Sequence, residues 1–428
     1  MAPLFPFVPI HDGVTAAQLR FEKPLLYMSL IMVACQSDLD RQSDIARLVR
    51  YEISQAALVR GEKSPALLQA LLILISWNHI HIHLGGQLIN YLQISSAILV
   101  ELGIDKEAKH RSKTSAGAIG DLGRDSQVER ARSLEERRGF LGLYWTNSIT
   151  KSCLKDITPI PFSRYADQCC RILESTMEYF GDAYLVRLVH VQRKIDKIRD
   201  ILYTEDSVYM SGMSIPLVMG VSSLEQELQT LEDSLPPAVG VAQLLYLSHQ
   251  SVRLYLRKIS LDDRLFHSLS CANDGNATRY SMFRTNLLSS CLATIDSLMS
   301  LVFALPTDLV LSLPYLHWGQ IGHALLILTR LSEVRHEAWN ATYVSSVLDP
   351  RAIYVRLADK IDEVMAAGGS KMPRQRLPAI LGSMAARLRE LSESPKMGLG
   401  ISEDVGLVSD EDFINDIISN MLNIDHLY

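Results

Sequence analysis

Three histidines lie at alternating positions in the stretch WNHIHIHLGG, which covers residues 77–86. They are His79, His81 and His83. On a β-strand, alternate side chains point to the same face, so this spacing would gather three imidazole rings. Imidazole is a common ligand of zinc, copper and iron. Whether the stretch has the geometry of a metal site therefore depends on its secondary structure.

The residues on both sides of this stretch have a helical pattern. Ser64 and Pro65 are typical of an N-cap and a first helical position, and a long apolar run follows to Trp77. Gly85-Gly86 ends the run before a second helix, which is predicted over 87–102. We therefore interpret WNHIHIH as a helix end and turn, on which only His79 and His83 share a face. A structural role is expected and no metal site, because two imidazoles without a carboxylate do not complete one.

Helical signals continue along almost the whole chain. Residues 15–18 have the spacing of a capping box, and Pro24 suits the first turn of the next helix. An apolar face at helical spacing follows in Ile45, Leu48, Val49, Ile53 and Ala56. Further helices are predicted over residues 134–156, 164–180, 184–203, 223–234, 240–260, 279–304, 308–333, 352–366 and 376–393. No series of alternating short strands occurs, so we expect an all-α fold, a large irregular multi-helix domain.

The chain divides into a helical body and a tail. We expect one body over residues 1–396, in which a polar, glycine- and serine-rich insertion lies at about 104–132. The last 32 residues, 397–428, hold seven acids and no Lys or Arg, out of a net charge of -6 for all 428 residues. The remaining 41 acids and 42 bases leave the body nearly neutral, without a basic field that would attract nucleic acid.

The tail alternates acidic and bulky apolar residues, which is the composition of amphipathic activation segments. A helix here would carry one broad apolar face. We expect this activation face to comprise Phe413, Ile414, Ile417, Ile418, Met421 and Leu422. A C-terminal helix docked on the body explains the same pattern equally well.

Tests for catalytic, metal and targeting motifs are negative. The six cysteines are scattered without a CxxC pair, so neither a zinc knuckle nor a disulfide framework is indicated. The N-terminal residues lack the pattern of a signal peptide, and the apolar run ending at Trp77 is too short to span a membrane. Asp262-Asp263 resembles the start of the aspartate-rich box of helical terpene synthases, but no third acid follows it here. Asp196 and Asp200 are expected on an exposed, salt-bridged helix face. Phosphate-binding loops and a GxSxG elbow are absent, so we expect no enzyme and no catalytic residues.

Three blocks of the sequence resemble the fungal-specific transcription factor domain, the middle homology region of binuclear zinc-cluster regulators. They are FPFVPIHDGVTAAQLRFEKPLLYMSLIMVA (5–34), the segment 59–105 with its Trp/His turn and Leu102-Gly103, and LEERRGFLGLYWTNSITKSCLKD (134–156). The last block carries Arg137, Arg138, Tyr144 and Trp145. The likeness covers roughly residues 5–395 and lies in block order and spacing.

The resemblance implies an all-helical regulatory module that controls DNA-binding and activation parts, in some cases through a small-molecule effector. It places the protein in the nucleus. Family members carry six clustered cysteines before this region that bind two zinc ions and place a helix in the major groove. The cysteines here lack that spacing, so DNA contact is not expected from this chain, and zinc is expected only with such an N-terminal cluster.

We therefore predict a transcription regulator that acts through protein contacts, with a coactivator or a paralogous regulator as partner, or as a homodimer. Arg137 and Arg138 are expected either in ordinary interhelix pairing or in holding the tail. Trp77, Tyr144 and Trp145 are candidates for an effector pocket, with core packing as the alternative. The alternatives to this function are a stand-alone interaction protein without DNA binding and a helical enzyme of the terpene-synthase type.

Overall fold

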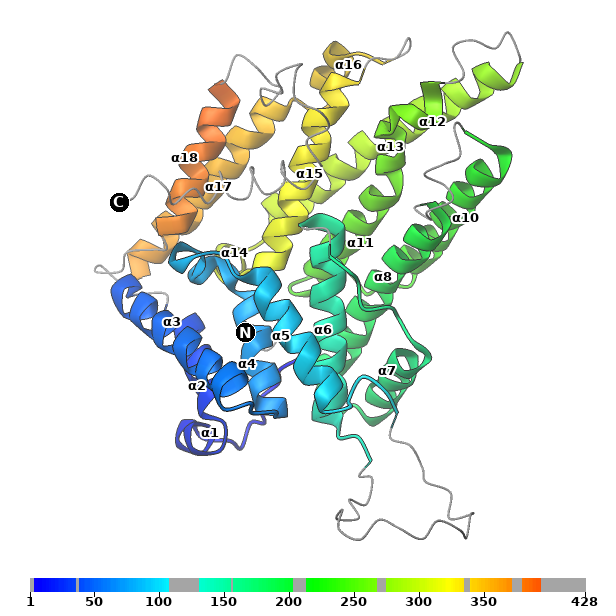
Figure 1. Cartoon of the computed structure of the whole chain (residues 1–428). Helices are drawn as coiled ribbons and strands as arrows, with labels where there is room; N and C mark the ends of the chain where they lie inside the picture. Colours follow the sequence, from blue (N-terminus) through cyan, green and yellow to red (C-terminus); the bar gives the residue numbers. More distant parts are fainter. Residues whose placement is uncertain are drawn as a thin grey trace, which may run out of the picture.

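The computed structural model describes residues 4–35, 38–107, 131–154, 157–202, 213–267, 275–334, 339–371 and 379–393. These residues form α-helices joined by turns and contain no β-strand (Figure 1). The predicted all-α fold is confirmed. One continuous hydrophobic core contains buried side chains from Leu4 in the N-terminal segment to Leu388 in the last described helix.

The N-terminal helices begin where the sequence predicts caps. Thr15 and Gln18 form a complete capping box, Pro24 is at the first position of its helix, and Ser64 accepts from the backbone N–H of Leu67. A side-chain acceptor satisfies an N–H group that has no partner inside the helix, which fixes the helix start. The helices are α1 (Ala16–Glu22), α2 (Pro24–Ala34), α3 (Leu39–Ser54), α4 (Pro65–Ser76) and α5 (Leu88–Glu101).

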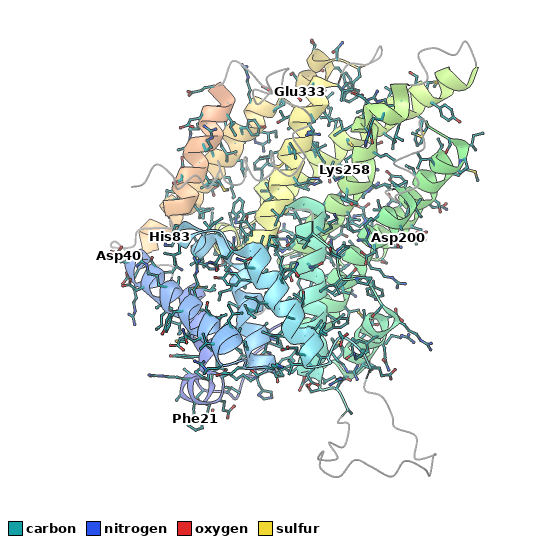
Figure 2. The ribbon with its side chains drawn as sticks, viewed as in Figure 1. Phe21, Asp40, His83, Asp200, Lys258 and Glu333 are labelled. Atoms are coloured by element: carbon teal, nitrogen blue, oxygen red, sulfur yellow. The ribbon has the colours of Figure 1, made fainter. Side chains whose placement is uncertain are left out.

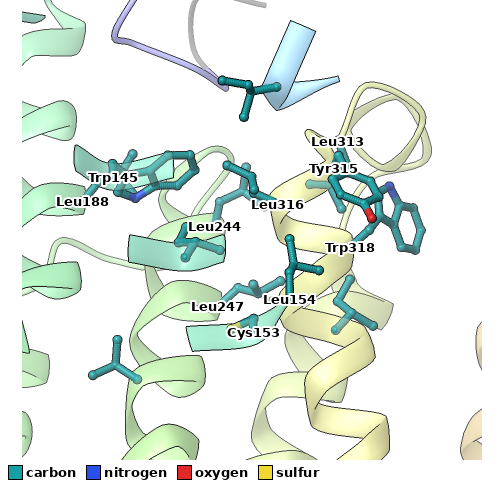
Figure 3. Packing of buried hydrophobic residues seen from close by; sticks show 14 of the residues in the cluster. Trp145, Cys153, Leu154, Leu188, Leu244, Leu247, Leu313, Tyr315, Leu316 and Trp318 are labelled. Atoms are coloured by element: carbon teal, nitrogen blue, oxygen red, sulfur yellow. The ribbon is translucent and has the colours of Figure 1, made fainter. Parts of the chain in front are cut away.

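Three helices are buried along most of their length and form the centre of the molecule. They are α4, α6 (Leu134–Cys153) and α15 (Tyr315–Glu333). A helix that is apolar on all sides must be surrounded by other helices. Accordingly, α6 packs on both α4 and α15, and Figure 3 shows Leu316 of α15 directed towards Trp145 of α6 and Leu244.

The remaining helices enclose this centre. They are α7 (Arg164–Thr176), α8 (Gly181–Leu202), α10 (Ile215–Asp233), α11 (Ala242–Arg257), α12 (Asp263–His267), α13 (Gly275–Ala304), α14 (Thr307–Leu311), α16 (Ala341–Val347), α17 (Pro350–Lys371) and α18 (Ala379–Glu393). α17 and α18 lie side by side (Figure 1). Residues 280–304 of α13 are long and apolar enough to cross a membrane, but half of this window is buried, and α13 packs on α11 and α15 as a core helix does.

The structure corrects several details of the prediction. The single helix predicted over 308–333 is two, α14 and α15, because Pro314 precedes the first turn of α15 and interrupts the run. Leu48, predicted on the apolar face of α3, is exposed, and Ala46 is buried there instead. The short helices α12 and α16 were not predicted. Of the predicted insertion, residues 108–130 lie outside the described ranges.

Candidate functional site

The histidine stretch is a turn, as predicted, and not a strand. α4 ends at Ser76, and two 3-10 turns, Asn78–Ile80 and Ile82–Leu84, follow before Gly85 adopts a positive φ of 99°. A positive φ is strained for residues with a side chain, so a glycine suits this position.

The three imidazoles contact different parts of the protein. The ring of His79 stacks on Tyr315, His81 Nε2 lies 3.0 Å from the Leu74 carbonyl oxygen, and His83 Nε2 lies 3.0 Å from Ser43 Oγ. Burial lowers the pKa of His79 to about 3 and that of His81 to about 4, so both rings are neutral. The turn therefore joins α4 to α15 and α3 through its histidines.

The residues that the structure describes do not fit the zinc cluster that the resemblance implies. In these residues, no three His, Cys, Asp or Glu side chains lie close enough to hold a metal ion. Cysteines 153, 169, 170 and 291 are buried free thiols. The two adjacent acids that resemble the terpene-synthase box pair with different arginines. Asp262 pairs with Arg264, and Asp263 pairs with Arg284.

The aromatic residues predicted for an effector pocket are all buried in the core. Trp77 and Trp145 both pack near Phe5, with ring centroids 5.9 and 6.1 Å from it. Phe7 lies 5.4 Å from Trp145. The N-terminal segment is therefore bound to α4 and α6 through two phenylalanines. The described cavity below has other lining residues, so an effector pocket at these aromatic residues stays a prediction.

Tyr144 forms a hydrogen bond to a buried acid. Its hydroxyl donates to Asp196 Oδ2 at 2.9 Å, and the Phe162 backbone N–H donates to the same oxygen. Burial raises the pKa of Asp196. The expectation of an exposed Asp196 is wrong, because this part of α8 packs on α6, whereas the side chain of Asp200, labelled in Figure 2, is 69% exposed.

Two glycines let α6 approach its neighbours closely. A Cβ added at Gly142 would lie 2.8 Å from Phe7 Cβ and 3.1 Å from Leu72 Cδ1, and one at Gly139 would lie 3.3 Å from Leu68 Cδ2. The N-terminal segment and α4 thus pack directly on the α6 backbone. The start of α6 is fixed by a capping box between Ser133 and Glu136.

Arg138 is a buried charge at the start of α6. Its Nε and Nη2 donate to the two carboxylate oxygens of Asp182 at 2.7 and 2.8 Å, and the two side chains are 2% and 1% exposed. Nη1 pairs with Glu178 Oε2 at 2.8 Å, and the guanidinium lies 4.6 Å from the ring centre of Tyr179. This two-pronged pairing fits a planar guanidinium and fastens α6 to the start of α8.

The turn between α7 and α8 supplies Glu178 and Tyr179, and Asp182 lies in the first turn of α8. Met177 adopts a left-handed conformation, with φ 47° and ψ 49°, and ends α7. A non-glycine residue in this region carries strain of about 1 kcal/mol or more. The Tyr179 N–H donates to Asp182 Oδ2 at 3.0 Å, which holds the turn against α8. Sequence analysis identified Arg138 but none of its partners, because nothing in the spacing connects residues 44 positions apart.

A cavity of about 340 Å³ lies beside Arg138, Glu178 and Tyr179. It is bounded by the N-terminal segment, α1, α2, α4, the start of α6 and the α7–α8 turn. Lys23 extends into this region and its ammonium pairs with Glu135 and lies 3.4 Å from Gln69 Oε1. The lining residues are Pro9, Ile10, His11, Val14, Leu19, Glu22, Lys23, Leu26, Gln69, Ser133, Leu134, Glu135, Arg138, Glu178 and Tyr179.

The other predicted sites are placed only in part. Arg137 lies apart from the cavity, with Nη1 3.5 Å from Cys169 Sγ and its guanidinium 5.9 Å from the ring centre of Tyr165. The predicted activation face in the tail lies outside the described residues. Whether either arginine holds the tail therefore stays a prediction.

Comparison with known proteins shows that the chain is similar to fungal transcription factors. Four curated relatives match the chain, and each is named a transcription factor. Transcription factor himD of Aspergillus japonicus is 25% identical over 340 residues, which is 78% of this chain and 54% of that protein. Transcription factor opdL of Penicillium oxalicum is 24% identical over 373 residues, 86% of this chain and 64% of that protein.

A third relative, transcription factor pbcR of Emericella nidulans, is 22% identical over 352 residues, 77% of this chain and 44% of that protein. The chain thus spans about half of the length of the curated relatives it matches. No family model matches the chain, and no solved structure does. The shared naming of the relatives supports a transcription regulator.

Proposed function

We propose that this chain is the regulatory part of a fungal transcription factor that acts in the nucleus. The observation that carries the proposal is the similarity to named transcription factors over 77–86% of the chain. The resemblance of residues 5–34, 59–105 and 134–156 to the middle homology region of zinc-cluster regulators agrees with it. In this proposal the chain acts through protein contacts and has no catalytic step.

The helical body restrains the acidic tail, and the tail binds a coactivator. The tail has the composition for this role, because its acids accompany an apolar row at helical spacing, Phe413, Ile417 and Met421. Such an apolar row can pack into a groove on a partner protein. Acids at the N-terminal end of the helix stabilise it through the helix dipole. A small-molecule effector that binds the body shifts the balance between the restrained and the free tail.

The test is a reporter assay in a fungal host with fusions to a heterologous DNA-binding domain. We expect residues 397–428 to activate the reporter strongly and the full chain to activate it less. Replacing Phe413, Ile417 and Met421 with alanine is expected to abolish activation, whereas a matched control that replaces Val405, Leu407 and Val408 leaves it near the starting level. A silent reporter with both the tail and the full chain would refute the proposal.

A further inference from the structure

The two cations of the cavity are already neutralised by the protein. Arg138 directs Nε and Nη2 to Asp182 and Nη1 to Glu178, so each of its nitrogens has a partner. The ammonium of Lys23 pairs with Glu135. A ligand that carries a carboxylate or a phosphate would have to displace one of these acids, which would leave a carboxylate without its cation.

The acids of the cavity outnumber its cations. Glu22, Glu135 and Glu178 line the space, and Asp182 lies behind Arg138. The three carboxylates that line the cavity exceed the two lining cations, Lys23 and Arg138, by one negative charge. Glu22 has no ion-pair partner within the described ranges. Carboxylates accept hydrogen bonds only, so the cavity offers acceptors to a donor that carries positive charge.

Apolar side chains from different elements also line the cavity. Ile10 lies on the N-terminal segment, Leu19 on α1, Leu26 on α2 and Leu134 on α6. A volume of about 340 Å³ is at the lower end of the range for small-molecule sites, which combine apolar walls with a few polar groups. The volume and these apolar side chains therefore suit a compact molecule with an apolar body.

We propose that this cavity binds a small organic amine, with its ammonium group at Glu22 and Glu135 and its apolar body against Leu19, Leu26 and Leu134. The ligand bridges the N-terminal segment, α1 and the start of α6. It would stabilise the packing of these elements, because a ligand that binds only the folded arrangement shifts the population towards it. The role of this amine as an effector rests on the proposed function, but its binding does not.

The test uses isothermal titration calorimetry on the purified full chain at pH 7 with three probes of the same size. They are 4-phenylbutylamine, 4-phenylbutanoate and 4-phenylbutan-1-ol, which share an apolar body and differ in the polar group at one end. We expect the amine to bind at least about tenfold more tightly than the carboxylate, with the alcohol between them. Equal affinities, a preference for the carboxylate, or no binding of any probe to the folded protein would overturn the proposal.

Variants locate the binding. Glu135→Gln removes one acid and leaves Lys23 without its partner, so the preference for the amine is expected to fall several-fold. Val14→Trp fills the cavity without a change of charge and is expected to abolish binding of all three probes. Glu363→Gln is the matched control, since Glu363 also pairs with a lysine, Lys360, but lies on α17. A Glu135→Gln variant with the preference of the control would contradict the site.

The two proposals fail separately. If Val14→Trp abolishes amine binding but leaves the reporter signal unchanged, the amine site stands and its role as an effector site is ruled out. If the tail activates the reporter, the body lowers that activation and no amine binds, the proposed function stands and the amine site is ruled out.

Discussion

Removing Asp182 is expected to cost a large part of a typical protein's free energy of unfolding. Asp182→Ala leaves the guanidinium of Arg138, which is 2% exposed, with Glu178 as its one acidic partner, and Glu178 is 43% exposed. It also removes the acceptor of the Tyr179 N–H. Breaking a buried ion pair by removing one partner costs about 3–5 kcal/mol, against a total free energy of unfolding of about 5–15 kcal/mol.

A double-mutant cycle separates the pair from other effects of each substitution. Arg138→Met and Asp182→Leu are made singly and together, and the free energy of unfolding is measured by urea denaturation followed by far-UV circular dichroism. We expect the double variant to lose about 2 kcal/mol less than the sum of the single variants, since it leaves neither charge unpaired. The control is Arg387→Ala, whose partner Glu390 is exposed, with an expected loss of about 0.5 kcal/mol or less.

The reasoning would be refuted if Asp182→Ala lost less than about 1 kcal/mol, or if the cycle gave a coupling energy near zero. Either result would mean that water reaches the guanidinium in the folded protein. The same outcome would weaken the cavity geometry, because Arg138 and Glu178 are part of its wall.

Two further predictions concern packing and pH. Gly142→Ala is expected to lower the free energy of unfolding by about 1–3 kcal/mol despite alanine's higher helix propensity, because its Cβ would meet Phe7 Cβ at 2.8 Å. Gly382→Ala, whose Cβ would lie 3.6 Å from the end of Met365, is the control and is expected to be neutral or stabilising in the same thermal melts. The lowered pKa values of His79 and His81, about 3 and about 4, mean that the unfolded chain binds protons below pH 6.5 while the folded chain does not. The free energy of unfolding therefore contains the full contribution of these neutral rings above pH 6.5. As the pH falls from 6.5 to about 4, it decreases by about 1.4 kcal/mol per histidine per pH unit. Melting temperatures measured across this range would show the slope, and His81→Gln should flatten it; an unchanged slope in that variant would contradict the assignment.

Features that depend on neighbouring residues were predictable from the sequence. The capping box at Thr15 and Gln18, the start of α4 at Ser64-Pro65 and the turn at WNHIHIH were all predicted and are confirmed. Each is set by a few consecutive residues, through a cap, a fixed proline φ or a break in periodicity. The same local reasoning missed the break before α15, since the apolar spacing continues across Pro314.

The sequence by itself determined the all-helical class and the positions of most helices, because hydrophobic periodicity and caps act over a single turn of chain. The tertiary structure alone decided which charges are buried together. Arg138 meets Asp182 from 44 residues away, and Asp196 is buried under Tyr144 although its neighbours in sequence are charged. It also decided the cavity, whose walls come from Lys23, Glu135 and Glu178 on separate helices and turns. Such pairings depend on how helices pack against one another, and a helical pattern fixes which face is apolar but not which neighbour covers it.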